Sequence, residues 1–200
     1  MSDWLRSSAV PILPAAAELL KDLSGVLARW GGWYLFGAQA VIAHGVPRLS
    51  ADVDVTLRMT PEDPERFAHE MAQAGFDLAV HDPEFVRRTR VMPFIHRGTA
   101  MPLDVVLAGS GLEDEFLARA RPVDLGGVIV PLIDIEDLII AKVLAGRTKD
   151  LDDARNLWSA RGRDVDPQRI RRILRLLEEA LSQSDLVTAF ETIVRRTASS

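Results

Sequence analysis

The sequence contains no cysteine and no long apolar run. The lack of cysteine excludes disulfides, thiolate catalysis and zinc sites built on sulfur, and it is compatible with a reducing compartment. No stretch approaches the roughly 20 apolar residues that a membrane-spanning helix needs. The sequence also has fewer positive than negative charges, and its formal net charge is -5. The average electrostatic field of the protein therefore repels nucleic acid. We therefore expect a cytoplasmic protein with no membrane partner, which would meet nucleic acid only through a local basic patch.

The 200 residues, of which 48% are hydrophobic and 26% charged, suit a single compact domain with at most a small helical appendage. Apolar spacing and the positions of Gly and Pro predict a mixed α/β core over 1–132 and a helical C-terminal part over 133–200, packed on the core. Strands are expected at 33–36, 53–57, 91–96 and 103–107 and as a hairpin within 122–130, and helices at 14–30, 38–44, 60–75, 136–145, 151–160, 167–180 and 185–196.

Two aspartates, Asp52 and Asp54, stand at the entrance of the strand expected at 53–57. Successive side chains of a strand alternate between its faces, so residues two apart point the same way. Two ionised carboxylates in one place repel each other unless a divalent cation neutralises them, and hard oxygen ligands suit magnesium. The other interpretation is two solvated acids on a turn. The pair alone does not decide between these interpretations.

Two further features accompany the aspartate pair. Gly37 follows the strand expected at 33–36 and lets backbone N–H groups of the next helix approach a phosphate. Asp104 interrupts the apolar run 103–107, where a charge is costly unless it is paired, metal-bound or sited at a cleft. The alternative for Asp104 is the exposed face of an edge strand. Three carboxylates and a glycine turn together favour metal-assisted phosphoryl or nucleotidyl transfer.

The order of these motifs resembles the nucleotidyltransferase superfamily of the DNA polymerase β type. The resemblance rests on the pair Gly37-Ala38, on Asp-x-Asp at Asp52 and Asp54, and on a third aspartate at Asp104 in a later strand. It implies an α/β (α+β) fold in which a mixed β-sheet is flanked by helices, here followed by the helical C-terminal part.

The segment 48–54, Arg-Leu-Ser-Ala-Asp-Val-Asp, is similar to the AbiEii-type branch of stand-alone bacterial nucleotidyltransferases, which includes toxins of toxin–antitoxin pairs. The segments 135–142 and 147–153 are similar to later motifs of the same branch. The whole resemblance covers roughly residues 33–158, and only the combined order of its motifs is specific.

The resemblance implies that Asp52 and Asp54 hold two magnesium ions. Asp104 would share one of these ions and help to deprotonate the attacking hydroxyl group.

On the phosphate side, the resemblance implies that the backbone of Gly37 and Ala38 approaches the β- and γ-phosphates of a nucleoside triphosphate such as ATP. Ser50 is a candidate hydroxyl donor to these phosphates, and Arg48 is a candidate cation. Many family members carry serine or glycine where this chain has Ala38, so a serine hydroxyl is missing and only backbone donors remain.

Three residues of the helical part are also candidates. Lys142 lies beside the apolar stripe of its expected helix, from which its ammonium group could reach a phosphate. Asp150 and Asp153 share one face at the start of a helix, and the resemblance implies that this acidic motif belongs to the active centre. The alternatives are an ordinary surface lysine and acids that favour the positive end of the helix dipole. Arginines of the helical part could form a basic stripe that meets RNA phosphates, but the acids between them favour a solvated helix face: Arg161, Arg163, Arg169, Arg171, Arg172 and Arg175.

The leading interpretation is a magnesium-dependent enzyme that transfers a nucleotidyl group from a nucleoside triphosphate to a hydroxyl group of RNA or tRNA, a protein or a small molecule. In the AbiEii-type branch, such an enzyme can be a toxin with a small antitoxin as its partner. A catalytically silent module of the same fold, which binds a nucleotide or a partner protein, is the alternative that Ala38 favours and the three aspartates disfavour. A glycosyltransferase that uses Asp-x-Asp is disfavoured because a short chain shows no second, sugar-binding half.

Overall fold

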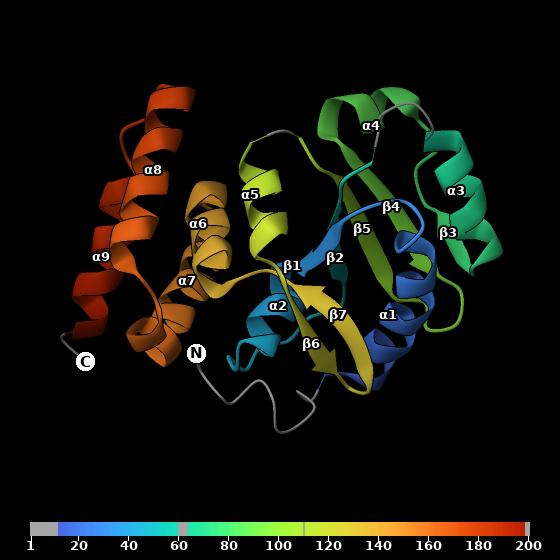
Figure 1. Cartoon of the computed structure of the whole chain (residues 1–200), viewed down its shortest axis with the longest axis horizontal. Helices are drawn as coiled ribbons and strands as arrows, with labels where there is room; N and C mark the ends of the chain where they lie inside the picture. The colour runs from blue at the N-terminus through green and yellow to red at the C-terminus, as the bar shows by residue number, and fades with distance from the viewer. Residues whose placement is uncertain (1–11, 60–63, 110, 199–200) are drawn as a thin grey trace. The chain divides into compact units, whose positions relative to one another are not determined.

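A computed structural model describes residues 12–59, 64–109 and 111–198 of the chain. These residues divide into two compact units, the first within 12–43 and 47–133 and the second within 44–46 and 134–198. The first unit contains a β-sheet with helices, whereas the long elements of the second are all helices (Figure 1).

The first unit is built around a seven-stranded sheet in the order β3-β4-β5-β2-β1-β7-β6. The pairs β2–β5 and β1–β7 are parallel and the other neighbours are antiparallel, so the sheet is mixed. The predicted α/β class is confirmed. The strands are β1 (Trp33–Phe36), β2 (Val53–Leu57), β3 (Phe76–Leu78), β4 (Val91–His96), β5 (Pro102–Leu107), β6 (Arg121–Leu125) and β7 (Val128–Leu132). The helices are α1 (Pro14–Leu27), α2 (Gly37–Ala43), α3 (Pro64–Gln73), α4 (Pro83–Thr89) and α5 (Leu112–Arg119).

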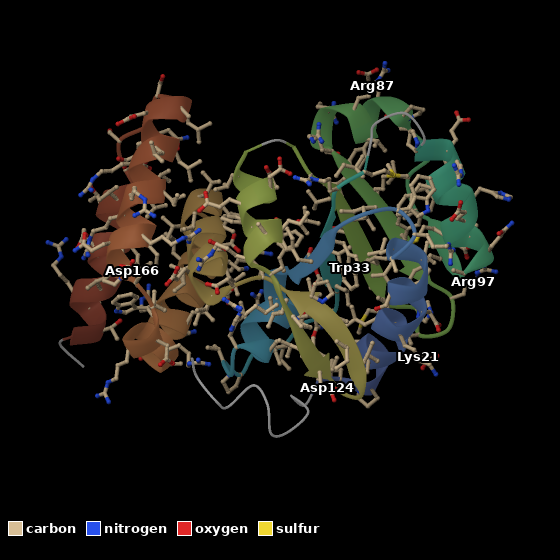
Figure 2. The ribbon with its side chains drawn as sticks, viewed as in Figure 1. Lys21, Trp33, Arg87, Arg97, Asp124 and Asp166 are labelled. Atoms are coloured by element: carbon tan, nitrogen blue, oxygen red, sulfur yellow. The ribbon has the colours of Figure 1, made fainter. Side chains whose placement is uncertain are left out.

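The core of the first unit follows from the alternation of apolar residues along its strands. Val53, Val55 and Leu57 of β2 are fully buried on one face, so the residues between them point to the other face. Helix α1 packs beside β7 and α3 with an apolar stripe of helical spacing. Trp33 lies among the strands, whereas the charged ends of Lys21 and Arg97 reach outward (Figure 2). The site-bearing strand β2 is therefore a central, rigid strand.

Three elements of the first unit were not predicted from the sequence: β3, α4 and α5. Strand β3 has three residues, too few for a period of two to be visible. Helix α4 begins with a helix-start motif that is present in the sequence. The Asp82 side chain caps the helix by accepting a hydrogen bond from the Glu84 N–H, and Pro83 occupies the first turn. Helix α3 begins at Pro64 within the described residues, and its expected start at 60–63 lies outside them.

The second unit contains the four helices predicted for the C-terminal part. These are α6 (Ile135–Ala145), α7 (Thr148–Arg161), α8 (Pro167–Leu181) and α9 (Leu186–Ala198), with a short 3-10 helix η2 (Gly162–Asp164) after α7. Phe190 of α9 is fully buried and meets the Trp158 ring of α7 edge-on, with 5.4 Å between ring centroids. Across the described residues, no helix combines the length and apolar content that crossing a membrane requires.

Candidate active site

The first part of the site is the turn between β1 and α2, which Gly37 forms. Its φ of +65° is a left-handed conformation that side chains with a Cβ rarely adopt. A Cβ built at Gly37 would also overlap Oδ2 of Asp54 and lie 2.6 Å from Cγ of the same carboxylate. Only glycine therefore allows the main chain of this turn to lie so close to the Asp54 side chain. Ala38, the next residue, is buried.

The second part is a pair of aspartates on adjacent strands. Asp54 of β2 and Asp104 of β5 are direct register partners in a parallel pair, and both are half-buried. Register partners on neighbouring strands project from the same face of a sheet. The two carboxylates therefore face the same region, next to the Gly37 turn.

Asp52 completes the group from the loop that leads into β2. Ser50 Oγ lies 2.9 Å from Asp52 Oδ1 and 3.0 Å from the Asp52 carbonyl oxygen. A hydroxyl group has one hydrogen, so Ser50 can donate to only one of these acceptors at a time. Arg48 lies half-buried on the same loop. The structure thus places Asp54 and Asp104 side by side next to the Gly37 turn, and it places Asp52 and Ser50 on the loop that leads into β2.

The electrostatics of this group favour a cation. Burial first, and then the negative charge of Asp52, raise the pKa of the Asp104 carboxyl group above its usual range. Such a carboxyl group is a better proton acceptor once it is ionised than an ordinary aspartate is. A cation placed beside it would lower that pKa again. The raised pKa of Asp104 therefore reports its burial and the nearby negative charge of Asp52.

The donor set fits magnesium by its chemistry, since carboxylate oxygens are the hard ligands that this ion prefers. In the conformation of the described residues, however, no three Asp, Glu or His side chains lie close enough together to hold a metal ion. The in-register pair Asp54 and Asp104 supplies two carboxylates directly. Asp52 does not form a three-ligand group with them in this conformation of the described residues.

Lys142, Asp150 and Asp153 are brought together in the second unit. Lys142 Nζ lies 2.9 Å from Asp150 Oδ1 and 2.8 Å from Asp153 Oδ2, and all three side chains are buried. Arg147 also donates to Asp150, from Nε to Oδ2 at 2.5 Å. Burial would raise the pKa of Asp150, but the hydrogen bonds from Arg147 and Lys142 outweigh it and hold that pKa below its usual range. The predicted phosphate-binding ammonium group is therefore already paired with two carboxylates.

A second buried ion cluster links α6 and α8. Arg169 Nη1 lies 2.6 Å from Asp137 Oδ1 and 3.5 Å from Glu136 Oε2, and only 7% of Arg169 is exposed. The expectation of a solvated face is therefore wrong for Arg169. The sequence contains one indication of this ion pair. Asp137 is an acid inside the apolar helix pattern 135–143, and a buried acid needs a charged partner.

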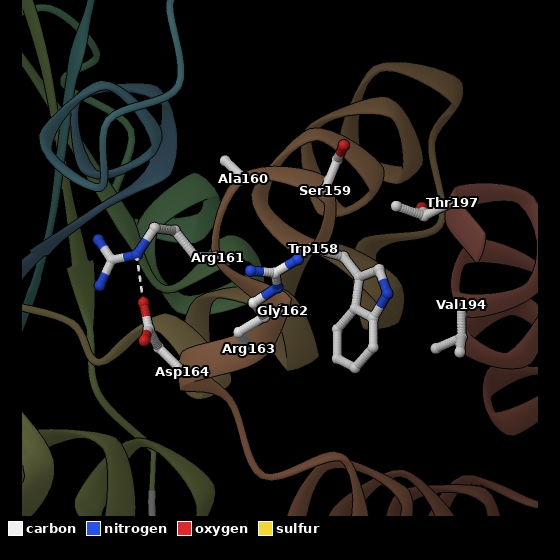
Figure 3. A pocket seen from close by; sticks show the side chains of 9 residues that line it. All are labelled: Trp158, Ser159, Ala160, Arg161, Gly162, Arg163, Asp164, Val194 and Thr197. Atoms are coloured by element: carbon white, nitrogen blue, oxygen red, sulfur yellow. Dashed lines mark hydrogen bonds and ion pairs between the residues drawn. The ribbon is translucent and has the colours of Figure 1, made fainter. Parts of the chain in front are cut away.

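A pocket in the second unit lies at the end of α7, along η2 and against α9 (Figure 3). The Trp158 ring, Val194 and Thr197 line it. Among the described residues of its lining, Asp164 is the one acid, and Arg161 Nε lies 2.7 Å from its Oδ2. The pocket therefore offers no set of carboxylates comparable with that of the first unit.

A family model described as "Nucleotidyltransferase of unknown function (DUF6036)" matches residues 16–197. The chain belongs to this nucleotidyltransferase family. The match spans nearly the whole chain, and it confirms the enzyme class that Gly37 and the three aspartates predicted. Membership of the AbiEii-type branch stays a prediction.

Solved structures agree with this nucleotidyltransferase family in their fold. The antibiotic-resistance factor ANT(2'')-Ia in solution is 16% identical, with a TM-score of 0.55 over 83% of this chain and 96% of that chain. A nucleotidyltransferase-like antigen from Paracoccidioides brasiliensis is 16% identical, with a TM-score of 0.52 over 88% of this chain and 89% of that one. The lincosamide antibiotic adenylyltransferase LnuA with lincomycin bound is 13% identical, with a TM-score of 0.50 over 74% and 98%. No curated protein matches the sequence.

Proposed function

We propose that this nucleotidyltransferase moves a nucleotidyl group from a magnesium-bound nucleoside triphosphate to a hydroxyl group at the Asp52, Asp54 and Asp104 site. The observation that carries the proposal is the in-register pair of Asp54 and Asp104 beside the left-handed turn at Gly37. Two half-buried carboxylates that face one region from adjacent strands supply the hard oxygen ligands that a divalent cation prefers.

Asp54 and Asp104 would hold magnesium together with Asp52. When bound, the ion would stabilise negative charge on the α-phosphate and on the leaving pyrophosphate. In the transfer, the acceptor hydroxyl oxygen forms a bond to the α-phosphorus, and the bond from this phosphorus to the bridging oxygen breaks. Pyrophosphate leaves with the electron pair. Asp104, which faces the same region as Asp54, would help to take up the hydroxyl proton.

The glycine turn would serve the phosphates of the donor. The main chain at Gly37 lies against the Asp54 carboxylate, so backbone N–H groups of Gly37 and Ala38 would donate to the β- and γ-phosphates. Ser50 would add a hydroxyl donor and Arg48 a cation. In the second unit, the ion pairs of Lys142 with Asp150 and Asp153 would have to open before its ammonium group could bind a phosphate. We therefore propose that this cluster stabilises the packing of α6 against α7.

The acceptor would be a hydroxyl group of RNA or tRNA, a protein or a small molecule. The names of two structures with the same fold mention lincomycin and adenylyl-2''-tobramycin, which makes antibiotics with hydroxyl groups a natural part of the acceptor panel. The AbiEii-like segment 48–54 adds the proposal of a toxin with a small antitoxin partner.

The test is turnover with each of the four nucleoside triphosphates, magnesium and this acceptor panel. Mass spectrometry would detect an acceptor heavier by one nucleotidyl group, and a coupled assay would detect pyrophosphate. Asp52→Asn and Asp54→Asn should abolish both signals. Asp77→Asn, which changes an exposed aspartate on β3, is the matched control and should leave them unchanged. Equal turnover in all variants would place the chemistry elsewhere.

A catalytically silent module is the second candidate, and a specific observation favours it. Ala38 has no hydroxyl group to donate at the position where many family members carry serine. Such a module would bind a magnesium-bound triphosphate in calorimetry and yield no product with any acceptor.

A further inference from the structure

The short helix α2 carries one polar side chain, Gln39, that the site described above does not use. Gln39 is fully buried within the otherwise small and apolar stretch from Ala38 to Val41. Its Nε2 donates a hydrogen bond to the carbonyl oxygen of Asp52 at 3.2 Å. The residue therefore ties the helix after the glycine turn to the loop that bears Asp52.

The orientation of the Gln39 amide follows from this contact. The partner on Asp52 is a carbonyl oxygen, which only accepts, so the NH2 end of the amide has to face it. The reverse orientation would set two acceptors against each other. The other end of the amide, Oε1, is then buried and has no hydrogen-bond partner within the described part of the chain.

A purely structural role leaves this arrangement unexplained. A buried acceptor without a donor costs stability, and such a group in a folded protein needs a reason. An apolar side chain of the same length would fill the space without that cost. The contact of Gln39 with Asp52 provides a functional reason.

The carbonyl group of Asp52 has two side-chain donors, Gln39 and Ser50. Asp52 is exposed, lies just before β2, and has Ser50 as a donor to either its carboxylate or its carbonyl group. When Ser50 donates to the carboxylate, Gln39 is the donor that remains for the carbonyl group. We propose that Gln39 is a positioning residue that fixes the Asp52 main chain, so that the Asp52 carboxylate can join Asp54 and Asp104 around a divalent cation.

The part of this inference that concerns the cation rests on the proposed function. The anchoring of Asp52 by Gln39 does not depend on it. Residues that orient metal ligands from outside the coordination shell typically change metal affinity or activity about 10- to 100-fold when they are replaced. Gln39 should behave in this way without acting on the substrate itself. Its free Oε1 would accept a hydrogen bond from a water or hydroxyl group in the loaded site.

The test compares Gln39→Met, which keeps the length of the side chain and removes its polar atoms, with Gln73→Met on the exposed face of α3. Hydrogen exchange of the metal-free protein should be faster for the amides of residues 50–53 in Gln39→Met, and unchanged in Gln73→Met. Titration with Mn2+ alone, followed by electron paramagnetic resonance, should give an affinity about 10- to 100-fold weaker for Gln39→Met. The melting temperature of Gln39→Met should stay close to that of the wild type, because removal of a buried acceptor without a donor offsets the lost hydrogen bond to Asp52.

The outcomes separate the two proposals. Unchanged exchange at residues 50–53 would overturn the anchoring role, whatever the metal does. Faster exchange with unchanged Mn2+ affinity would overturn the link between anchoring and the cation. If the wild-type protein binds no Mn2+, the proposed function at the three aspartates fails, and the exchange data still decide whether Gln39 anchors Asp52.

Discussion

Replacing Gly37 by alanine tests whether the main chain of the glycine turn really lies against the Asp54 carboxylate. Two costs add. The left-handed conformation at φ +65° costs a residue with a Cβ about 1–2 kcal/mol. The new Cβ also overlaps Oδ2 of Asp54 and lies 2.8 Å from the Asp54 Cβ, and such overpacking typically costs about 1–3 kcal/mol. The expected loss in the free energy of unfolding is therefore about 2–5 kcal/mol.

The assay is urea unfolding followed by circular dichroism, with Gly127→Ala as the matched control. Gly127 also has a positive φ, +90°, but a Cβ there would meet no atom within 4 Å. The control should show only the conformational cost of about 1–2 kcal/mol. In the Asp54→Ala background the extra cost of Gly37→Ala should shrink, because the overlapping carboxylate is gone. Equal destabilisation by the two glycine variants in the wild-type background would refute the close approach.

Three further predictions concern the charged groups. Because burial and the charge of Asp52 raise the pKa of Asp104, an NMR titration of the metal-free protein should show this carboxyl group taking up its proton at a pH above the usual aspartate value of about 3.9, and added Mg2+ should lower that pKa. Lys142→Met leaves two carboxylates buried without their lysine and should lower the free energy of unfolding by about 3–5 kcal/mol, whereas the exposed Lys149→Met should change it by less than about 0.5 kcal/mol in the same urea titration. The lowered pKa of Asp150 means that its contribution to stability is complete above the unfolded-state pKa and is lost as the pH falls through the folded-state pKa, so acid unfolding should be less steep in Asp150→Asn than in the wild type.

Much of the fold could be predicted from local patterns of the sequence. Strand β2 shows apolar residues with a period of two, and α1 shows an apolar stripe with helical spacing. The order of strands could not be predicted in this way. Strand β5 lies beside β2 although β3 and β4 come between them in the chain, and no local pattern records that crossover.

The candidate site could likewise be predicted only in part from the sequence. The residue types at Asp52, Asp54 and Asp104 indicated metal chemistry, but the direct register of Asp54 with Asp104 appears only in the folded sheet. Gln39 was missed because a single polar residue in a short helix is ordinary until its burial is known. The pairing of Lys142 with two buried aspartates was likewise hidden, since a lysine beside an apolar stripe usually reaches water.

The most direct test of the central claim is calorimetric titration of each nucleoside triphosphate, with magnesium, into the wild type and three variants. We predict that the wild type and the control Asp77→Asn bind at least one triphosphate equally well, and that Asp54→Asn and Asp104→Asn bind it much more weakly. Undiminished binding by Asp54→Asn and Asp104→Asn would contradict the assignment of the donor site to these carboxylates.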